Sequence, residues 1–258
     1  MAESHDAPVV VITGANGHIG SALALKFMLE GWAVLALDYE ESPVAPAAIT
    51  AGAPLKFIPI DLEDEDARNE SIKGILASTD RLDCLVNCAA FVGTSNLEGW
   101  NVEFVAQSLE TWRRALEVNL TAPFHLSRDL ANLLARSPNG SIVNVSSIYG
   151  EFGPDLELYE GLEMHNPAAY AASKAGLVQL TRWLSTVLAP AVRVNAVSPG
   201  GLLRGQPPVF VERYTKKVPL ARMASEADVV DSIYFLASPA ASYITGQVLR
   251  VDGGWGVW

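Results

Sequence analysis

The chain has 258 residues, and half of them are hydrophobic. No apolar run approaches the roughly 20 residues that a membrane-spanning helix requires. The formal net charge of -11 at pH 7, with a pI near 4.8, argues against nucleic acid or an anionic membrane surface as a partner. These properties predict a soluble protein with a substantial core, in one large domain or two small ones.

The first residues, Met1 to Pro8, contain neither the basic nor the apolar region of a secretory signal. Residues 1–7 are expected to form a flexible tail. Cys84 and Cys88 lie in one predicted strand, where four residues span roughly 13 Å, beyond the reach of a disulfide. We therefore expect reduced thiols and a cytoplasmic protein.

The first structural signal is a strand, a glycine turn, a helix and a second strand within 38 residues. Residues 8–13 form a β-branched apolar run typical of a strand buried on both faces. A helical pattern follows the turn and ends at Gly31, and the apolar run 32–37 leads to Asp38. This order predicts a dinucleotide-binding unit.

The glycine turn at residues 14–20 suits a diphosphate. A backbone without Cβ atoms can turn sharply and approach the ligand, and the helix that follows offers free N–H groups and the positive end of its dipole. Its position between a strand and a helix favours this function over a turn that binds nothing. The predicted contacts are Gly14, Asn16, Gly17, His18, Ile19 and Gly20.

Asp38 lies where a dinucleotide fold places an acid against the adenosine ribose hydroxyls. Its carboxylate would repel the 2′-phosphate of NADP, and the residues that follow, Tyr39, Glu40 and Glu41, include no Arg or Lys. We therefore predict NAD in preference to NADP; the alternative is a solvated turn aspartate. Asp61 follows the third strand, where its carboxylate could accept from the adenine amino group.

The alternation of strands and helices continues along the chain. Further strands are predicted at residues 56–60, 84–87, 141–146, 193–197 and 247–251, and helices at about 63–77, 108–136, 166–188 and 226–236. The small residues of Asn87-Cys-Ala-Ala90 would let a cofactor lie close to the backbone. The alternation implies an α/β protein with a Rossmann-type, doubly wound parallel sheet and helices on both faces. Because no linker or repeat interrupts it, we predict a single domain, residues 1–258.

Pro123 lies inside the long predicted helix. It lacks the N–H that would bond to the carbonyl of Asn119, and its ring would clash there. The helix is expected to kink and to free this carbonyl for a water molecule. The alternative is a structural kink without a chemical role.

Tyr170 and Lys174 lie one helical turn apart on the same face. Asn166 and Pro167 fit the N-cap and the first position of their helix. A tyrosine ionises near pH ~10, but a nearby lysine cation favours the phenolate and lowers its pKa. The pair therefore predicts proton transfer to or from a substrate oxygen. Taken alone, the spacing also fits an ordinary amphipathic helix.

In combination, these motifs are specific. The chain resembles the single-domain short-chain dehydrogenases/reductases over essentially its whole length, through Thr13-Gly14-…-Gly20, Asp61-Leu62, Asn87-Cys-Ala-Ala90, Asn119, Ser146-Ser147, Tyr170-x-x-x-Lys174, Ser198-Pro199-Gly200 and Val251-Asp252-Gly253-Gly254. The resemblance implies hydride transfer between a substrate carbinol carbon and nicotinamide C4. It also implies cofactor contacts from Leu62, Asn87, Ala89, Tyr170, Lys174, Pro199, Gly200 and Leu202.

The resemblance further implies a catalytic tetrad and no metal. Tyr170 would be the acid/base, and Lys174 would hold the nicotinamide ribose and lower the tyrosine pKa. Ser147 would bind the substrate oxygen, and Asn119 would anchor a proton relay through water. Ser147 is assigned because the two residues and the glycine that follow it match the family pattern; Ser146 is the alternative.

Three features depart from the family pattern. His18 occupies a position where the single-domain branch usually has glycine, and the glycine spacing is closer to that of the larger, sugar-nucleotide-acting branch. Arg204 replaces a threonine that often touches the carboxamide. The segment between Ser147 and Tyr170 is longer than usual, and the insertion at residues 153–166 is expected to overhang the substrate site. The alternative is a surface excursion.

The sequence predicts the type of reaction more specifically than the substrate. Polar groups of the insertion suit a hydroxyl-rich ligand, and the expected substrate contacts are Ser147, Tyr159, Tyr170 and Arg204. The stretch from Leu158 through Trp183, with Arg204-Gly-Gln-Pro207, is similar to oxidoreductases of bacterial surface-sugar and flagellin-modification pathways. A sugar or polyol derivative is therefore the leading prediction, and a 3-oxoacyl thioester is the alternative.

Two other functions have distinct signatures. A module that senses NAD without turnover is disfavoured because Tyr170 and Lys174 are both present, and an epimerase would keep tightly held NAD through purification. By resemblance, the last strand and the long helices pack across two-fold axes, so we expect a homotetramer, or at least a homodimer. The substrate identity, the direction of reaction and the assembly stay open at this point.

Overall fold

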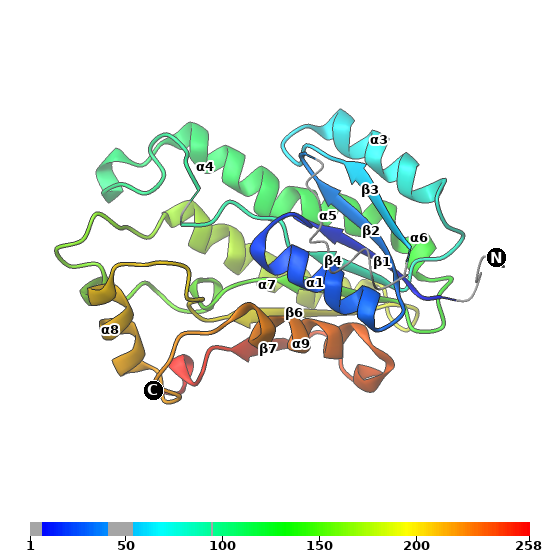
Figure 1. Ribbon diagram of the computed structural model, residues 1–258. Helices are drawn as coiled ribbons and strands as arrows, with labels where there is room; N and C mark the ends of the chain where they lie inside the picture. Colours follow the sequence, from blue (N-terminus) through cyan, green and yellow to red (C-terminus); the bar gives the residue numbers. More distant parts are fainter. Residues whose placement is uncertain (1–6, 41–53, 94) are drawn as a thin grey trace.

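The structure, a computed structural model, describes residues 7–40, 54–93 and 95–258 (Figure 1). The expected tail at residues 1–7 therefore lies, except for Ala7, outside the described residues. Seven parallel strands form one sheet in the order β3-β2-β1-β4-β5-β6-β7. The strands are β1 (Val9–Thr13), β2 (Ala33–Asp38), β3 (Leu55–Pro59), β4 (Cys84–Asn87), β5 (Ser141–Val145), β6 (Arg193–Pro199) and β7 (Val248–Val251).

Helices cover both faces of the sheet, because alternate strand residues face opposite sides. Val10 and Ile12 pack with α1 (His18–Leu29) and α9 (Glu226–Ala237), whereas Val11 packs with the helices of the other face. Those helices are α3 (Glu65–Leu76), α5 (Ala122–Asp129), α6 (Ala131–Leu134) and α7 (Ala168–Val187), and α4 (Leu109–Leu116) packs on α7 through Ala115 and Ala169. The predicted fold class, a doubly wound parallel sheet in a single domain, is confirmed. Within the described residues, no helix is long and apolar enough to cross a membrane.

The helical segment predicted over residues 108–136, with an irregularity at Pro123, is present over residues 109–134. The segment divides into α4, a π-helical turn η2 (Glu117–Thr121), α5 and α6. At Pro123 the missing N–H leaves the α-helical ladder incomplete. The helix adapts by widening, because the N–H of Ala122 donates to the carbonyl oxygen of Glu117, five residues earlier. The irregularity expected at Pro123 is therefore present, as a wider turn.

Helix α7 begins one residue later than the predicted cap implies. Pro167, with φ −66° and ψ 126°, takes the N-cap position, and Asn166 lies outside the helix. A distant side chain replaces the expected cap: Oε1 of Gln107 accepts from the N–H of Ala168 at 2.9 Å. Gln107 follows the short helix η1 (Phe104–Ala106), so the start of α7 is held by tertiary contact.

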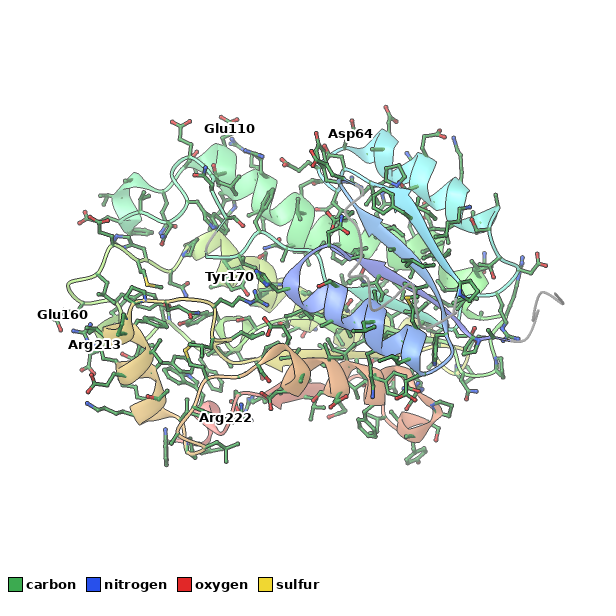
Figure 2. All side chains as sticks on the ribbon, viewed as in Figure 1. Asp64, Glu110, Glu160, Tyr170, Arg213 and Arg222 are labelled. Atoms are coloured by element: carbon green, nitrogen blue, oxygen red, sulfur yellow. The ribbon has the colours of Figure 1, made fainter. Side chains whose placement is uncertain are left out.

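The insertion at residues 153–166 forms a layer with helix α8 (Pro208–Lys217) at one end of the molecule (Figure 1). Leu158, in the short helix η4 (Leu156–Leu158), is fully buried in a cluster with Phe210 of α8. Arg213 donates from Nη1 to the carbonyl oxygen of Glu160 at 2.6 Å, and the two residues lie together in Figure 2. Lys217 pairs with Asp155 and Glu157. The insertion is therefore tied to α8 by both apolar packing and charge.

The remaining short helices complete the chain. They are η3 (Ile148–Gly150), η5 (Pro239–Ala241) and η6 (Trp255–Val257). The first of them follows β5 and brings the predicted catalytic serines toward α7, as described next.

Candidate active site

A cleft of about 1110 Å³ lies at the carboxyl ends of β1 and β2, close to the point where the strand order reverses between β1 and β4. Ligands of open parallel sheets bind at this position. Ten residues predicted to bind the cofactor line the cleft: Gly14, Asn16, Gly17, His18, Ile19, Gly20, Asp38, Asp61, Leu62 and Ala89. The structure thus brings the glycine turn, two acids and the segment after β4 together.

The glycine turn leaves no room for larger residues. Gly14 has a φ of +68°, and a Cβ there would lie 2.8 Å from Cα of Ala89. A Cβ on Gly20 would lie 1.9 Å from the carbonyl oxygen of Gly14, so α1 begins directly against the turn. The side-chain oxygen of Asn16 is buried without a hydrogen-bond partner. A close backbone, a free helix N-terminus and an unsatisfied acceptor fit a nucleotide cofactor.

Asp38 is held at the end of β2 by main-chain donors. Its Oδ2 accepts from the N–H of Asn16 and its Oδ1 accepts from the N–H of Tyr39, both at 2.8 Å. The first bond joins the acid to the glycine turn. The carboxylate therefore has a fixed position in the cleft.

Besides Tyr170 and Lys174, four further residues predicted to bind the cofactor do not line this cleft. Asn87 is buried at the end of β4, and Pro199 ends β6. Gly200 lines a second cavity, of about 520 Å³, beside the C-terminal segment. Leu202 forms an isolated bridge with Ala224. A cofactor role for these four residues stays a prediction.

The cleft also contains residues that the sequence did not single out. Phe91 and Val92 follow β4, and Arg114 comes from α4. Arg114 forms a two-point ion pair with Glu63, at 2.6 and 2.9 Å, and lies 5.6 Å from the ring centroid of Phe91. No local pattern marks them, because α4 meets the cleft only in the folded chain. Tyr39 also lines the cleft, and its position directly after Asp38 is a signal by which the sequence could have indicated it.

Ser147 and Tyr170 meet because η3 packs tightly on α7. A Cβ on Gly150, the last residue of η3, would lie 2.8 Å from the carbonyl oxygen of Lys174. This close approach places Ser147 near enough to Tyr170 for its side chain to lower the pKa of the phenol. Tyr170 lies near the centre of the molecule, on α7 (Figure 2).

The neighbouring serine has a different partner. Ser146 is buried and donates from Oγ to the carbonyl oxygen of Lys174 at 3.1 Å, which joins β5 to α7. Ser147 also accepts from the N–H of Tyr149 at 3.2 Å. The geometry therefore favours Ser147 over Ser146 as the partner of Tyr170.

Lys174 is almost fully buried, with an exposed fraction of 2%. Its Nζ donates to the carbonyl oxygen of Val145 at 2.7 Å and lies 5.8 Å from the ring centroid of Tyr170. Burial lowers the pKa of Lys174 to about 8. Its charge reaches the cleft, since it lowers the pKa of Cys88, one of the lining residues, against the larger opposing effect of burial.

The pKa of Tyr170 differs from the sequence expectation. Burial raises it above the usual value, and the side chain of Ser147 and the charge of Arg204 oppose this effect. The expected net lowering by Lys174 is therefore not observed, because desolvation outweighs the favourable interactions. Tyr170 is a neutral phenol in the protein without ligand.

Both polar atoms of the Asn119 side chain are hydrogen-bonded within the protein. Its Oδ1 accepts from the N–H of Phe91 at 2.8 Å, and its Nδ2 donates to the carbonyl oxygen of Phe91 and to Oγ of Ser173, both at 3.1 Å. Asn119 is completely buried in the π-helical turn. Its side chain thus joins the segment after β4 to α7, and only its main-chain carbonyl could serve a relay.

The two remaining predicted substrate residues lie in different places. Tyr159, from the insertion, shares a 2.6 Å hydrogen bond with the hydroxyl of Tyr149, and its ring lies 5.5 Å from that of Phe210. Arg204 instead lines the cleft of the glycine turn. Tyr159 does not line that cleft, but both residues lie near enough to Tyr170 to influence its pKa.

The comparisons with known proteins agree with this geometry. Residues 14–256 match the family model described as Enoyl-(Acyl carrier protein) reductase. The 3-oxoacyl-[acyl-carrier-protein] reductase FabG of Thermotoga maritima is 34% identical, over 95% of this chain and 96% of the relative. Post-translational flagellin modification protein A of Campylobacter coli is 29% identical, over 96% of this chain and 98% of the relative.

Solved structures share the whole fold. A short chain dehydrogenase from Leptospira borgpetersenii with bound NAD+ has a TM-score of 0.83 and 30% identity, covering 99% of this chain and 96% of that one. A protein from Beutenbergia cavernae described as an NAD(P) dependent gluconate 5-dehydrogenase, with bound NADP, has a TM-score of 0.85 and 33% identity. The coverage is 97% of both chains. The fold and a nicotinamide cofactor thus occur together in proteins similar to this chain.

Proposed function

The chain belongs to the short-chain dehydrogenase/reductase family and is an oxidoreductase acting on CH–OH groups, and from that premise we propose that it transfers a hydride between NAD(H) and a sugar or polyol derivative. Bound NAD(H) supplies the hydride chemistry, whereas the chain supplies position and a proton. The observation that carries the proposal is the packing of η3, which follows Ser147, against α7, where buried Lys174 lies 5.8 Å from the ring centroid of Tyr170.

The proton is moved by Tyr170 at the substrate oxygen. In carbonyl reduction the neutral phenol donates its proton, and in alcohol oxidation the phenolate accepts one. Ser147, whose side chain lies near Tyr170, donates to the same substrate oxygen and stabilises the charge that develops there. The raised pKa of Tyr170 suits proton donation at neutral pH.

Lys174 and Asn119 support this centre. With a pKa of about 8, Lys174 is mostly charged at pH 7 and can hold a ribose hydroxyl. The side chain of Asn119 fixes the π-helical turn, which leaves its carbonyl as the group for a water relay. Both roles follow the family resemblance.

The preference for NAD over NADP is part of the proposal. The partners of the Asp38 carboxylate, the N–H groups of Asn16 and Tyr39, carry no full charge. The carboxylate thus keeps its negative charge at the end of β2, where a 2′-phosphate would be repelled. One solved relative contains NAD+ and another contains NADP. The cofactor found in a relative therefore does not establish which of the two this chain prefers.

The insertion supports a hydroxyl-rich substrate. It brings Tyr159 into contact with Tyr149, two residues after Ser147. Paired phenol hydroxyls offer both a donor and an acceptor to substrate hydroxyls. The name of the Beutenbergia cavernae neighbour is consistent with a sugar acid.

A 3-oxoacyl thioester is the second candidate substrate. The relative from Thermotoga maritima, a 3-oxoacyl-[acyl-carrier-protein] reductase, favours it. The polar Tyr149–Tyr159 pair disfavours it, because an acyl chain would leave these hydroxyls without new partners.

We further propose a cytoplasmic homotetramer, or at least a homodimer. Large apolar side chains lie exposed on α7, on α9, after η5, on β7 and at residue 258, as on surfaces that pack against another protein. They are Trp183, Phe235, Tyr243, Leu249 and Trp258. The free thiols of Cys84 and Cys88 agree with a reducing compartment.

The test is turnover across substrate classes. NADH absorbance would be followed with sugars, sugar acids, sugar phosphates, nucleotide sugars, polyols and 3-oxoacyl thioesters. The proposal predicts activity on a sugar or polyol class. Activity confined to 3-oxoacyl thioesters would transfer the assignment to the second candidate, and NADH binding without turnover in any class would favour a sensing module.

A further inference from the structure

Arg204 follows β6 in a loop that several hydrogen bonds hold in place. Its N–H donates to Oε1 of Gln206 at 2.7 Å, and Nε2 of Gln206 donates to the carbonyl oxygen of Leu202 at 2.6 Å. The N–H of Leu203 donates to the carbonyl oxygen of Ala224 at 3.0 Å. The backbone from which the side chain extends is therefore well fixed.

The guanidinium of Arg204 has one nitrogen in use and one without a partner. Nε pairs with Oε1 of Glu226, the first residue of α9, at 3.2 Å. Nη2 is buried and has no hydrogen-bond partner. A buried, charged donor without an acceptor is costly, so this nitrogen indicates a place for an anionic oxygen. Arg204 lines the cleft together with Gly14, Gly17 and Gly20.

The other charged residues of the cleft leave Arg204 as the cation with a nitrogen available to an anion. Asp38, Asp61 and Glu63 are acids of the lining, and Arg114 is paired at two points with Glu63. Of the two arginines that line the cleft, Arg204 is thus the one with an unpartnered buried nitrogen. The N-terminus of α1, a helix of 12 residues, offers free N–H groups in the same cleft.

We propose that Arg204 binds the diphosphate of NAD(H) through Nη2, together with the N-terminus of α1. The inference rests on the NAD(H) cofactor proposed above. A guanidinium nitrogen makes strong, charge-assisted hydrogen bonds to phosphate oxygens. A substrate carboxylate is the competing occupant. The charge of Arg204 also reaches Tyr170, but the diphosphate is favoured because Arg204 lines the cleft together with the glycine turn and the N-terminus of α1.

The test is equilibrium binding, which needs no turnover. Calorimetry would give the Kd of NADH and of ADP-ribose, which has the diphosphate but no nicotinamide, and an NMR titration would give the Kd of adenosine, which has no phosphate. The variants are Arg204→Gln and Arg204→Lys. The matched control is Arg222→Gln, because Arg222 pairs with Asp228 of the same helix α9 but lies outside the cleft.

The proposal predicts that Arg204→Gln weakens NADH and ADP-ribose binding about 10- to 100-fold, the usual effect of a lost charged hydrogen bond. Adenosine binding should change less than about 3-fold, Arg204→Lys should keep most of the affinity, and Arg222→Gln should match the wild type. The salt dependence of the ADP-ribose Kd should also become weaker in Arg204→Gln, because one charge contact is lost.

Three results would overturn the proposal. One is an ADP-ribose Kd in Arg204→Gln equal to that of the wild type. Another is an equal loss for adenosine, which would indicate a general distortion of the cleft. The third is an unchanged ADP-ribose Kd with weaker binding of carboxylate-bearing substrates only. Failure of the cofactor assignment itself is distinct, since the wild type would then bind neither NADH nor ADP-ribose.

Discussion

The Nζ of Lys174 donates a 2.7 Å hydrogen bond to the carbonyl oxygen of Val145, at the end of strand β5. This bond ties the cation to the sheet and keeps it 5.8 Å from the ring centroid of Tyr170. The ammonium is buried with one identified acceptor, and its pKa falls to about 8. A charged lysine in this position therefore lowers the stability of the protein without ligand.

Replacing Lys174 by methionine should stabilise the protein at neutral pH. The pKa of this lysine is lower in the folded state than in the unfolded state, so the unfolded state binds more protons between about pH 8 and pH 10.5. Wild-type stability should therefore rise with pH through this window. At pH 7, Lys174→Met should raise the free energy of unfolding by about 1–3 kcal/mol, after the loss of the bond to Val145.

Urea unfolding at pH 7 and pH 10 would measure this difference. The gain from Lys174→Met should shrink at pH 10, where the wild-type lysine is largely neutral in the folded state. Lys216→Met, at an exposed lysine of α8, serves as the control and should change little at either pH. A Lys174→Met variant that is equally destabilised at both pH values would argue against the buried-charge account.

Asp38→Asn should reduce the discrimination between NAD and NADP. Asparagine keeps an oxygen for the N–H of Asn16 and so preserves the turn, but it removes the charge that repels the 2′-phosphate. The ratio of kcat/KM values for NAD and NADP should fall about 10-fold or more. Steady-state kinetics with both cofactors would measure it, and an unchanged ratio would show that Asp38 does not select the cofactor.

Tyr159→Phe should weaken substrate binding while leaving the cofactor affinity unchanged. The substitution removes the hydroxyl that bonds to Tyr149 but keeps the ring against Phe210. If the two hydroxyls act as one unit, Tyr149→Phe and the double variant should each raise KM by a similar factor, on the order of 5- to 10-fold. Fully additive effects in this double-mutant cycle would mean that the pair has no joint role.

Asn119→Ala should destabilise the fold as well as reduce activity. It leaves the N–H and the carbonyl of Phe91 and the hydroxyl of Ser173 without their partner in a buried region. The loss should be about 2–4 kcal/mol in the free energy of unfolding. Denaturant unfolding measures it; a loss of activity at unchanged stability would instead point to a purely chemical role.

The pH dependence of the reaction should follow Tyr170. Because its pKa is raised, the phenol stays protonated at neutral pH and can donate in reduction. The kcat/KM for alcohol oxidation should rise as the pH increases above neutrality, since the phenolate is the base. Initial rates between pH 6 and pH 10 would show this, and a rate of oxidation that falls with pH would contradict the assignment.

Much of the fold is visible in the sequence because its signals are local. Buried β-branched runs such as residues 8–13 gave the strands, and the turn at Gly14–Gly20 gave the place of the cofactor cleft. The division of the long helix at Pro123 was only partly predictable, since a missing N–H indicates an irregularity but not whether the turn kinks or widens. The structure resolves it as a π-helical turn.

The parts that escaped prediction depend on contacts between distant segments. Gln107 caps α7 from a loop 61 positions away, which no helix-start signal near Asn166 could reveal. Arg114 reaches the cleft from α4 only after folding. The pKa of Tyr170 depends on how deeply it is buried, which the spacing to Lys174 does not report.

The most direct test of the central claim compares wild type with Tyr170→Phe on the substrate that gives the highest turnover. The account predicts that kcat falls about 10²- to 10⁴-fold, because the ring stays but the proton donor is lost, while the Kd of NADH stays within about 3-fold. Turnover within about 10-fold of the wild type, with the same NADH affinity, would show that Tyr170 is not the acid/base.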